Sequence, residues 1–241
     1  MIQNKILGIQ QRIPLFVLKE ALLAFISDGT VDVDNIKQML QADYAGENRI
    51  KKTYNQVNSV ITNSPLTPFI QEHGVQLADA VKNATDQPLI LTALICGRYH
   101  FCYQVAKILA KQFRQQDIVS SQLLDKLISE IYGYNKSTQN SRNCAVPQLI
   151  EAGLIARPQP AMYEAVDPIA PVNQVTIDLW KEAFFANEPL FNRENEEDLF
   201  FEPFFRYNTI WGFELDHGWQ MYALLISPSV WASFQVLVQD A

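Results

Sequence analysis

Residues 134–166 constrain the fold of this chain more than any other stretch, because they combine a helix, a glycine stop and two short strands. Ser137 or Thr138 is predicted to cap the helix, since a hydroxyl there accepts a backbone N–H that has no partner within the helix. An apolar stripe at helical spacing follows at Val146, Leu149 and Ile150. Gly153 is expected to end the helix, because glycine adopts the left-handed conformation without a Cβ penalty.

The two short strands after this helix complete a recognisable layout. Residues 154–157 and 162–166 are predicted to pair across a tip made of Pro158, Gln159 and Pro160. A helix followed by a glycine and a two-stranded ribbon is the order of elements in a winged helix-turn-helix. In that fold the last helix enters a DNA major groove, and the wing touches the DNA backbone.

The first turns of the predicted helix carry side chains that suit contact with DNA. They are cations, amides and hydroxyls with no carboxylate among them: Lys136, Ser137, Thr138, Gln139, Asn140, Arg142 and Asn143. Cations and hydroxyls contact phosphates, whereas Asn, Gln and Arg also read base edges. The alternative is a solvated helix face that closes a helical domain, as in winged helices of protein-protein modules. Pro147 is expected to kink or re-cap this helix.

The first sixty residues predict a second helix-turn-helix order. Pro14 opens an amphipathic helix, and Asp32 or Asp34 is expected to cap a second helix over 35–44. A third helix over 47–61 is basic on its outer side, where Arg49, Lys51 and Lys52 would contact phosphates. The alternative is a charged face that keeps an ordinary bundle helix in solution.

The middle of the chain is predicted to be helical as well. Residues 88–116 read as one long helix that is apolar on most sides over its first half, which is typical of a helix at the centre of a bundle. His100 is interpreted as a satisfied core or boundary histidine. Lys107, Lys111 and Arg114 form a basic stripe that would extend a DNA footprint. Ser120 or Ser121 is expected to cap the next helix, which stops at Gly133.

Charge divides the chain unevenly. Residues 1–163 hold 16 Lys+Arg against 13 Asp+Glu, a balance of +3, whereas residues 164–241 hold 3 against 13, a balance of −10. Such asymmetry indicates that the two parts bind different partners, or that the charge of one part partly offsets the charge of the other. The alternative is that the acidic residues keep a separate lobe in solution. We therefore expect a helical domain over residues 1–166 and an acidic, aromatic-rich α+β lobe over 167–241, which is either a protein-docking surface or an ordinary small core.

Within that lobe, prolines at 168 and 171 predict a linker, and residues 175–186 predict an amphipathic helix. A charge run follows at 193–198, and residues 209–226 have the pattern of a β-hairpin. The carboxylates Glu194, Glu196, Glu197 and Asp198 are of the type that holds a hard cation in a nuclease, but no lysine-bearing strand accompanies them. A solvated loop is the preferred interpretation.

Several classes of protein are disfavoured by the sequence. No apolar run reaches the roughly 18 residues of a membrane span, and no signal-peptide pattern opens the chain, so a cytoplasmic protein is expected. Three scattered cysteines and three dispersed histidines indicate neither a disulfide framework nor a metal site. No phosphate-binding glycine loop and no nucleophile or metalloprotease motif is present. We expect no catalysis and no cofactor.

Residues 12–157 resemble the BrxA family of bacterial BREX phage-defence systems. The pieces that carry the resemblance are RIPLFVLKEALLAF, ENRIKKTYNQVNSVI, the helical stretch over 88–116 and STQNSRNCAVPQLIEAGLI. The resemblance implies a largely helical, winged-helix-like protein that binds double-stranded DNA and has no catalytic site. Such proteins end near the position of Arg157, whereas this chain continues into an acidic, aromatic extension.

These observations predict a mainly α fold, a helical bundle with winged helix-turn-helix elements and a small α+β C-terminal lobe. The expected function is non-catalytic binding of double-stranded DNA in a phage-defence or regulatory assembly, with other proteins of that assembly as partners of the C-terminal lobe. The alternative is a protein-protein adaptor. DNA binding would weaken steeply with salt, whereas an adaptor would keep its partner.

Overall fold

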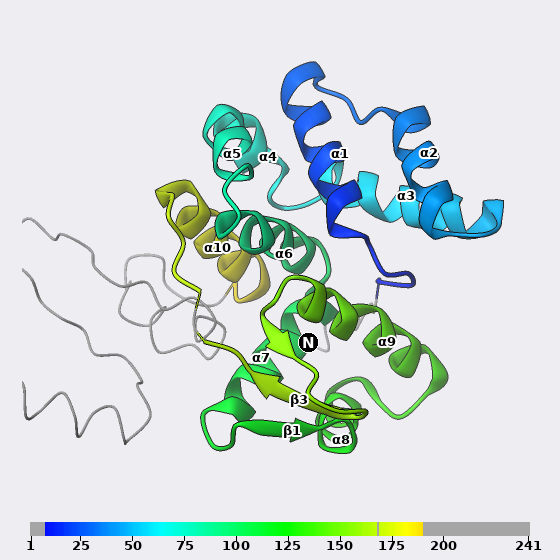
Figure 1. The fold of residues 1–241 in the computed structure, drawn as a ribbon, viewed down its shortest axis with the longest axis vertical. Coiled ribbons are helices and arrows are strands. Elements are labelled where there is room, and N and C mark those ends of the chain that lie inside the picture. The colour runs from blue at the N-terminus through cyan, green and yellow to red at the C-terminus, as the bar shows by residue number, and fades with distance from the viewer. Residues whose placement is uncertain (1–7, 168, 190–241) are drawn as a thin grey trace, which may run out of the picture.

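The computed structural model describes residues 8–167 and 169–189 (Figure 1). This part of the chain is mainly helical, as predicted, with ten helices and one small antiparallel sheet. In chain order the elements are α1 (Leu15–Asp28), α2 (Val33–Asp43), α3 (Glu47–Thr62), α4 (Thr67–Glu72), α5 (Gly74–Ala80), α6 (Asp86–Arg98), α7 (His100–Phe113), β1 (Ile118–Ser120), α8 (Ser121–Tyr132), α9 (Lys136–Glu151), β2 (Ile155–Ala156), β3 (Met162–Ala165) and α10 (Gln174–Asn187). None of the helices described is long and apolar enough to cross a membrane.

The first three helices follow the prediction closely. Helix α1 ends at Gly29, whose φ of 73° is left-handed, and Asp32 caps α2 by accepting the backbone N–H groups of Asp34 and Asn35. Helix α2 begins two residues earlier than expected, at Val33. A three-residue turn that ends in a second left-handed glycine, Gly46, joins α2 to α3. The predicted sequence of helices joined by short turns is therefore present in this region.

The single long helix predicted over 88–116 is wrong, because the chain breaks at Tyr99 into α6 and α7. Tyr99 has an extended backbone, with ψ of 94°, and its side chain is buried. The break exposes carbonyl groups at the end of α6, and the side-chain amide of Asn187 donates to one of them, the Cys96 carbonyl, over 3.0 Å. A residue of α10 therefore supplies a hydrogen bond that the helix break leaves unmade. No proline at the break would have predicted it from the local sequence.

Helices α8 and α9 are joined by three residues that begin with Gly133. Asn135 caps α9 by accepting the Thr138 backbone N–H, so the prediction that Ser137 or Thr138 is the cap is wrong. Pro147 removes one backbone donor without re-capping the helix, which continues to Glu151. The predicted stop is confirmed: Gly153 has φ of 67°.

The sheet has the order β1-β3-β2, and both pairings are antiparallel. The pairing of β2 with β3 across residues 157–161 confirms the predicted ribbon, with Ala156 opposite Glu164. Strand β1, which was not predicted, has only three residues and pairs with the other edge of β3. The backbone N–H of Ser121 also donates to the Ala161 carbonyl over 2.8 Å, so the tip of the ribbon is tied to the start of α8.

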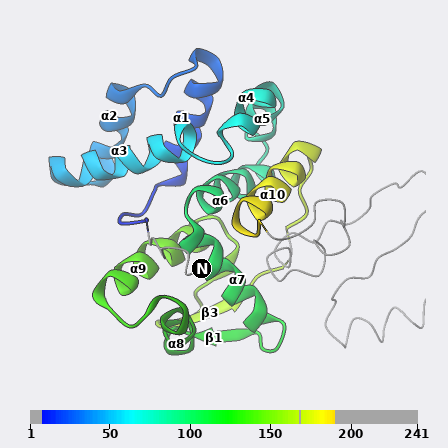
Figure 2. The same cartoon turned by 180° about the vertical axis from the view of Figure 1, so that it is seen from behind.

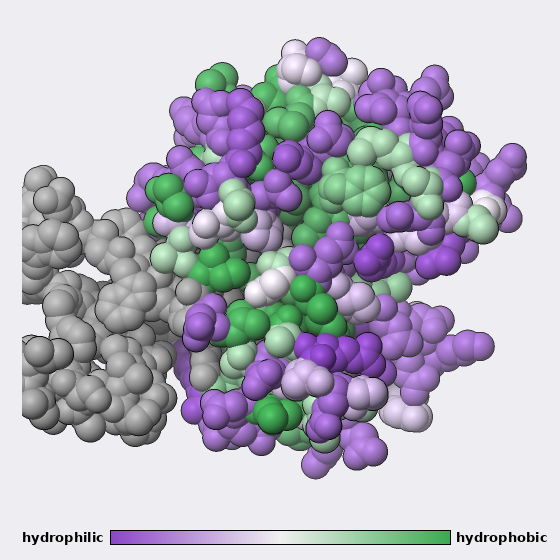
Figure 3. All heavy atoms as spheres, viewed as in Figure 1, coloured by the Kyte–Doolittle hydropathy of each residue, from purple (hydrophilic) through white to green (hydrophobic). Residues whose placement is uncertain are grey.

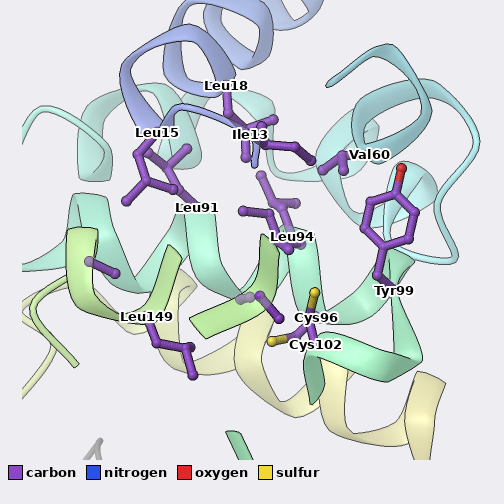
Figure 4. Packing of buried hydrophobic residues seen from close by; sticks show 14 of the residues in the cluster. Ile13, Leu15, Leu18, Val60, Leu91, Leu94, Cys96, Tyr99, Cys102 and Leu149 are labelled. Carbon is purple, nitrogen blue, oxygen red and sulfur yellow. The ribbon is translucent and has the colours of Figure 1, made fainter. Parts of the chain in front are cut away.

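One hydrophobic core includes α10 together with the preceding helices. Figure 4 shows part of this core, where Cys96 of α6 and Cys102 of α7 lie side by side. Helix α10 packs on α5 and α6, and Trp180 and Phe184 are buried there. The predicted boundary between residues 166 and 167 therefore does not separate α10 from the helices before it. The predicted charge run and hairpin lie outside the described residues.

Candidate nucleic-acid interface

The outward face of α9 carries most of the predicted polar residues. Lys136, Ser137, Asn140 and Asn143 are exposed, and Gln139 is half-buried. Figure 3 shows hydrophilic surface where α9, α2 and α3 reach the same side of the molecule. A cation, a hydroxyl and amides thus share one solvent-facing surface, with donors and acceptors suited to phosphates and base edges.

Two residues of the predicted set point into the protein instead. Thr138 is only 3% exposed. Arg142 forms a two-pronged ion pair with Asp125 of α8, with Nε–Oδ1 of 2.9 Å and Nη2–Oδ2 of 3.3 Å, and it also donates to the Tyr163 hydroxyl of β3. Arg142 therefore joins α9 to α8 and to the sheet, and neither Thr138 nor Arg142 lies on the outward face of α9 with the other predicted residues.

The three basic residues of α3 are all exposed, as predicted. Arg49 lies over the Tyr44 ring at 4.4 Å from its centroid and donates through Nε to the Gln11 side chain over 3.2 Å. Lys52 follows Arg49 by three positions, a spacing that shares a helix face, whereas Lys51 follows by two and points elsewhere. Arg49 and Lys52 thus lie on one face of α3.

The basic end of α3 lies close to α9. Burial raises the pKa of the Cys144 thiol on α9, and the positive charge of Arg49 acts on the same thiol in the opposite direction. Arg49 also donates to the Gln11 side chain, and the Ser141 hydroxyl of α9 donates to the Ile9 carbonyl two residues earlier, so Arg49 and the middle of α9 contact the same short segment. The structure therefore brings together parts of the two basic groups that the sequence placed about ninety residues apart.

The predicted basic stripe at the end of α7 keeps Lys111 and Arg114 at the surface, whereas Lys107 lies in an ion pair. Lys107 forms a largely buried ion pair with Glu188, just after α10, and the Tyr103 hydroxyl donates to the same carboxylate. His100 is exposed at the start of α7, and its Nδ1 lies 2.8 Å from the Asn187 side-chain oxygen. The prediction of a satisfied histidine is confirmed as a boundary contact, whereas the stripe loses Lys107.

Two exposed arginines were missed by the sequence analysis as site residues. Arg157 lies in the loop between β2 and β3, although it was predicted as the last residue of a strand; its signal was that residues 154–166 contain no other cation. Arg98 ends α6, where its Nε donates to the Ser59 hydroxyl of α3 over 2.7 Å. No local sequence pattern predicts that Arg98 is a site residue, because its position depends on the break at Tyr99.

No group of three or more His, Cys, Asp or Glu side chains among the described residues is arranged to hold a metal ion. A hollow of about 570 Å³ on the surface of α8 has a mixed lining of Gln122, Asp125, Lys126, Ser129, Glu130 and Tyr134. Tyr134 is 78% exposed at its rim.

Comparison with known proteins adds no relative: no family model, curated protein or solved structure matches this chain.

Proposed function

We propose that this protein binds double-stranded DNA without catalysis, using α9 as a recognition helix and α3 as a second basic contact. The first support is the unit formed by α8, a three-residue turn containing Gly133, and α9. A turn of three or four residues that often contains glycine is characteristic of helix-turn-helix units. The second helix of such a unit is the one that enters the major groove.

The elements around this unit support a winged version of it. Helix α7 and β1 precede α8, and β2 and β3 follow α9 in one antiparallel sheet of order β1-β3-β2. The loop between β2 and β3 occupies the place of the wing and carries the exposed Arg157. A cation at the wing would contact the phosphate backbone while the helix occupies the groove.

The observation that carries the proposal is the chemistry of the outward face of α9. Its exposed side chains at Lys136, Ser137, Asn140 and Asn143 include no carboxylate. The acidic residue of this helix, Glu151, is at its far end, where its carboxylate accepts the Leu15 backbone N–H and pairs with Arg12. A face that lacks negative charge suits a polyanion in a protein whose net charge is −7.

A duplex-DNA titration at two salt concentrations tests this proposal. The informative variant is Lys136→Ala/Asn140→Ala, because both residues are exposed and Arg142 is required internally. We expect affinity to fall with salt, and the variant to bind more weakly by about 1–3 kcal/mol for each base-reading contact that is lost. Lys82→Ala is the matched control, since Lys82 lies beyond α5 and pairs with Asp79. No shift of DNA by the wild-type protein at low salt would end the proposal.

The proposed setting is a bacterial phage-defence assembly of the BREX type in the cytoplasm, and it rests on the BrxA resemblance. In a strain that carries such a system, removal of this protein should restore phage plating. The Lys136→Ala/Asn140→Ala variant should behave like the deletion. If this variant still restricts phage growth, the defence role does not depend on DNA binding.

A plasmid incubated with the protein and Mg²⁺ tests the absence of catalysis. Plasmid that stays intact would support the non-catalytic assignment.

A protein-protein adaptor is the second candidate, and the exposed Tyr134 beside the hollow on α8 favours it. Aromatic residues are enriched at the centres of protein interfaces, and a tyrosine with most of its side chain in solvent suits insertion into a partner. For an adaptor, Tyr134→Ser would release a protein partner and leave DNA binding unchanged. A partner retained by this variant would count against the second candidate.

A further inference from the structure

An extended segment, residues 8–14, lies between α3 and α9, and we call it the strap. Figures 1 and 2 show it in dark blue between the two helices, on the side where both helix-turn-helix units lie. Ile9 and Ile13 are fully buried and anchor it in the hydrophobic core. The strap contains no helix or strand of its own, so its backbone polar groups need other partners.

Helix α9 supplies partners on one side of the strap. The Ser141 hydroxyl donates to the Ile9 carbonyl over 2.9 Å, and the Gln148 side-chain amide donates to the Ile13 carbonyl over 3.4 Å. Each of these side chains is only 3% exposed. The third contact is at the end of the strap, where the Glu151 carboxylate accepts the Leu15 backbone N–H over 2.9 Å.

Helix α3 and its turn supply partners on the other side. The Gln56 side chain accepts the Gln11 backbone N–H over 3.0 Å, and its amide lies 3.5 Å from the Gly8 carbonyl oxygen. The Tyr44 hydroxyl donates to the Arg12 carbonyl over 2.9 Å. The strap is therefore bound through its backbone by buried polar side chains from both helix-turn-helix units.

The side chain of Arg12 also links the two helix-turn-helix units, through ion pairs. One guanidinium nitrogen lies 3.2 Å from the Glu151 carboxylate of α9, and another lies 3.8 Å from the Asp43 carboxylate of α2. The Arg12 side chain is 39% exposed, so its electrostatic contribution is modest. It nevertheless contacts one residue of each unit and adds to the same connection.

The packing of the two helices explains why this connection matters. Helix α3 packs mainly on α1, α2, α4 and α6, whereas α9 packs on α7, α8 and β2. Buried hydrogen-bonding groups are costly to leave unpaired, so the backbone contacts of the strap favour one relative placement of Gln56 and Ser141. The strap thus provides a polar link between helices that otherwise pack on different neighbours.

We infer that the strap positions α3 relative to α9 so that one DNA duplex contacts both helices at once. This inference rests on the proposed function for its ligand, but the positioning itself does not depend on DNA. A duplex that spans both contacts needs more than about one helical turn, ~10 bp, because two groove contacts on one side of DNA have centres about one turn apart. Gln56 and Ser141 are positioning residues, since they touch the strap.

The first experiment measures the positioning without DNA. Spin labels at Lys52→Cys and Asn140→Cys, in a Cys144→Ser background, report the separation of α3 and α9; Cys96 and Cys102 are buried. We expect one narrow distance distribution with the strap intact and a broader one in Gln56→Ala/Ser141→Ala. Asn173→Ala is the control, because it removes a partly buried hydrogen bond to Asp86 remote from the strap. An unchanged narrow distribution in the double variant would overturn the inference.

A second variant, with a smaller change, tests the inference if Gln56→Ala/Ser141→Ala does not fold. Arg12→Ala removes only the charged bridge to Asp43 and Glu151 and leaves the backbone hydrogen bonds in place. We expect it to fold and to broaden the distance distribution less than Gln56→Ala/Ser141→Ala does. A distribution identical to that of the wild type in this variant, together with an unfolded double variant, would also count against positioning by the strap.

The second experiment measures the consequence for DNA with duplexes of about two turns, ~21 bp, and about one turn, ~10 bp. The wild-type protein should bind the longer duplex at least about tenfold more tightly, because two linked contacts raise the effective affinity. Gln56→Ala/Ser141→Ala should lose that advantage and keep its affinity for the shorter duplex. Absence of wild-type binding would refute the proposed function alone, whereas a retained advantage in the variant would refute the coupling.

Discussion

At the scale of single residues, orientation decides which of several similar side chains is available to a ligand. Lys136 and Arg142 are six positions apart on α9, and the sequence analysis gave both the same role. The first is exposed, whereas the second is tied to Asp125 and Tyr163. Arg142 therefore stabilises the unit that presents Lys136.

Arg142→Ala is expected to lower the free energy of unfolding by about 1–3 kcal/mol, because it leaves the partly buried Asp125 carboxylate without its cation. Lys136→Ala should change stability by no more than about 0.5 kcal/mol, since its side chain is exposed. Urea denaturation of both variants measures the contrast. Equal stabilities would show that the ion pair contributes nothing in solution.

Arg49→Gln is expected to raise the pKa of Cys144, because the charge of Arg49 favours the thiolate and opposes the effect of burial. The pH dependence of Cys144 alkylation measures this pKa independently of the absolute rate. The midpoint of the profile should move to higher pH in Arg49→Gln and stay in place in Arg49→Lys, which keeps the cation. If the midpoint stays in place in both variants, the charge of Arg49 does not act on Cys144.

At the scale of elements, the junction between α6 and α7 depends on contacts that come from distant parts of the chain. Asn187 donates to the Cys96 carbonyl at the helix end. Gly97 lies directly against Leu66, since an added Cβ would come within 2.3 Å of a Leu66 methyl carbon. The junction therefore requires a small residue at one position and a remote amide at another.

Gly97→Ala should destabilise the protein by about 1–3 kcal/mol through overpacking, because the added methyl group would overlap the Leu66 side chain, which is only 1% exposed. Leu66→Ala alone should also destabilise it, by leaving a cavity. The double variant should lose less than the sum of the two, since the new methyl group occupies the vacated volume. Strict additivity in thermal or urea unfolding would argue against this contact.

At the scale of the whole molecule, burial keeps several ionisable groups neutral in one core. Desolvation raises the pKa of the Cys96 and Cys102 thiols, and it raises the pKa of Tyr99 and of Tyr132 to about 12. All four groups are neutral when protonated. The folded state therefore holds protons that an unfolded chain releases at lower pH.

The free energy of unfolding is expected to fall as the pH rises above the unfolded thiol value of 9.0. Below that pH both states are protonated and the contribution of these groups is fully present; above it the unfolded state binds fewer protons, so rising pH favours unfolding. Urea denaturation between about pH 8 and 11 measures the slope. Cys96→Ala should make the slope shallower, and an identical slope would exclude this thiol as a contributor.

Much of the fold follows from local sequence, and the exceptions share a cause. The cap at Asp32, the stop at Gly153 and the ribbon after α9 were predictable, because each depends on residues only a few positions apart. The break at Tyr99 was not predictable, because the side-chain amide of the distant Asn187 supplies the hydrogen bond that the Cys96 carbonyl needs there. Strand β1 was not predictable either, because it forms only by pairing with β3.

The candidate site divides in the same way. The sequence by itself determined which types of side chain the outer turns of α3 and α9 carry, because helical periodicity separates polar from apolar positions. Only the tertiary structure decided that Thr138 and Arg142 turn inward, that α10 shares the core, and that the strap lies between the two basic helices. Periodicity describes one helix at a time, whereas burial and hydrogen bonding depend on which distant segments come to cover it.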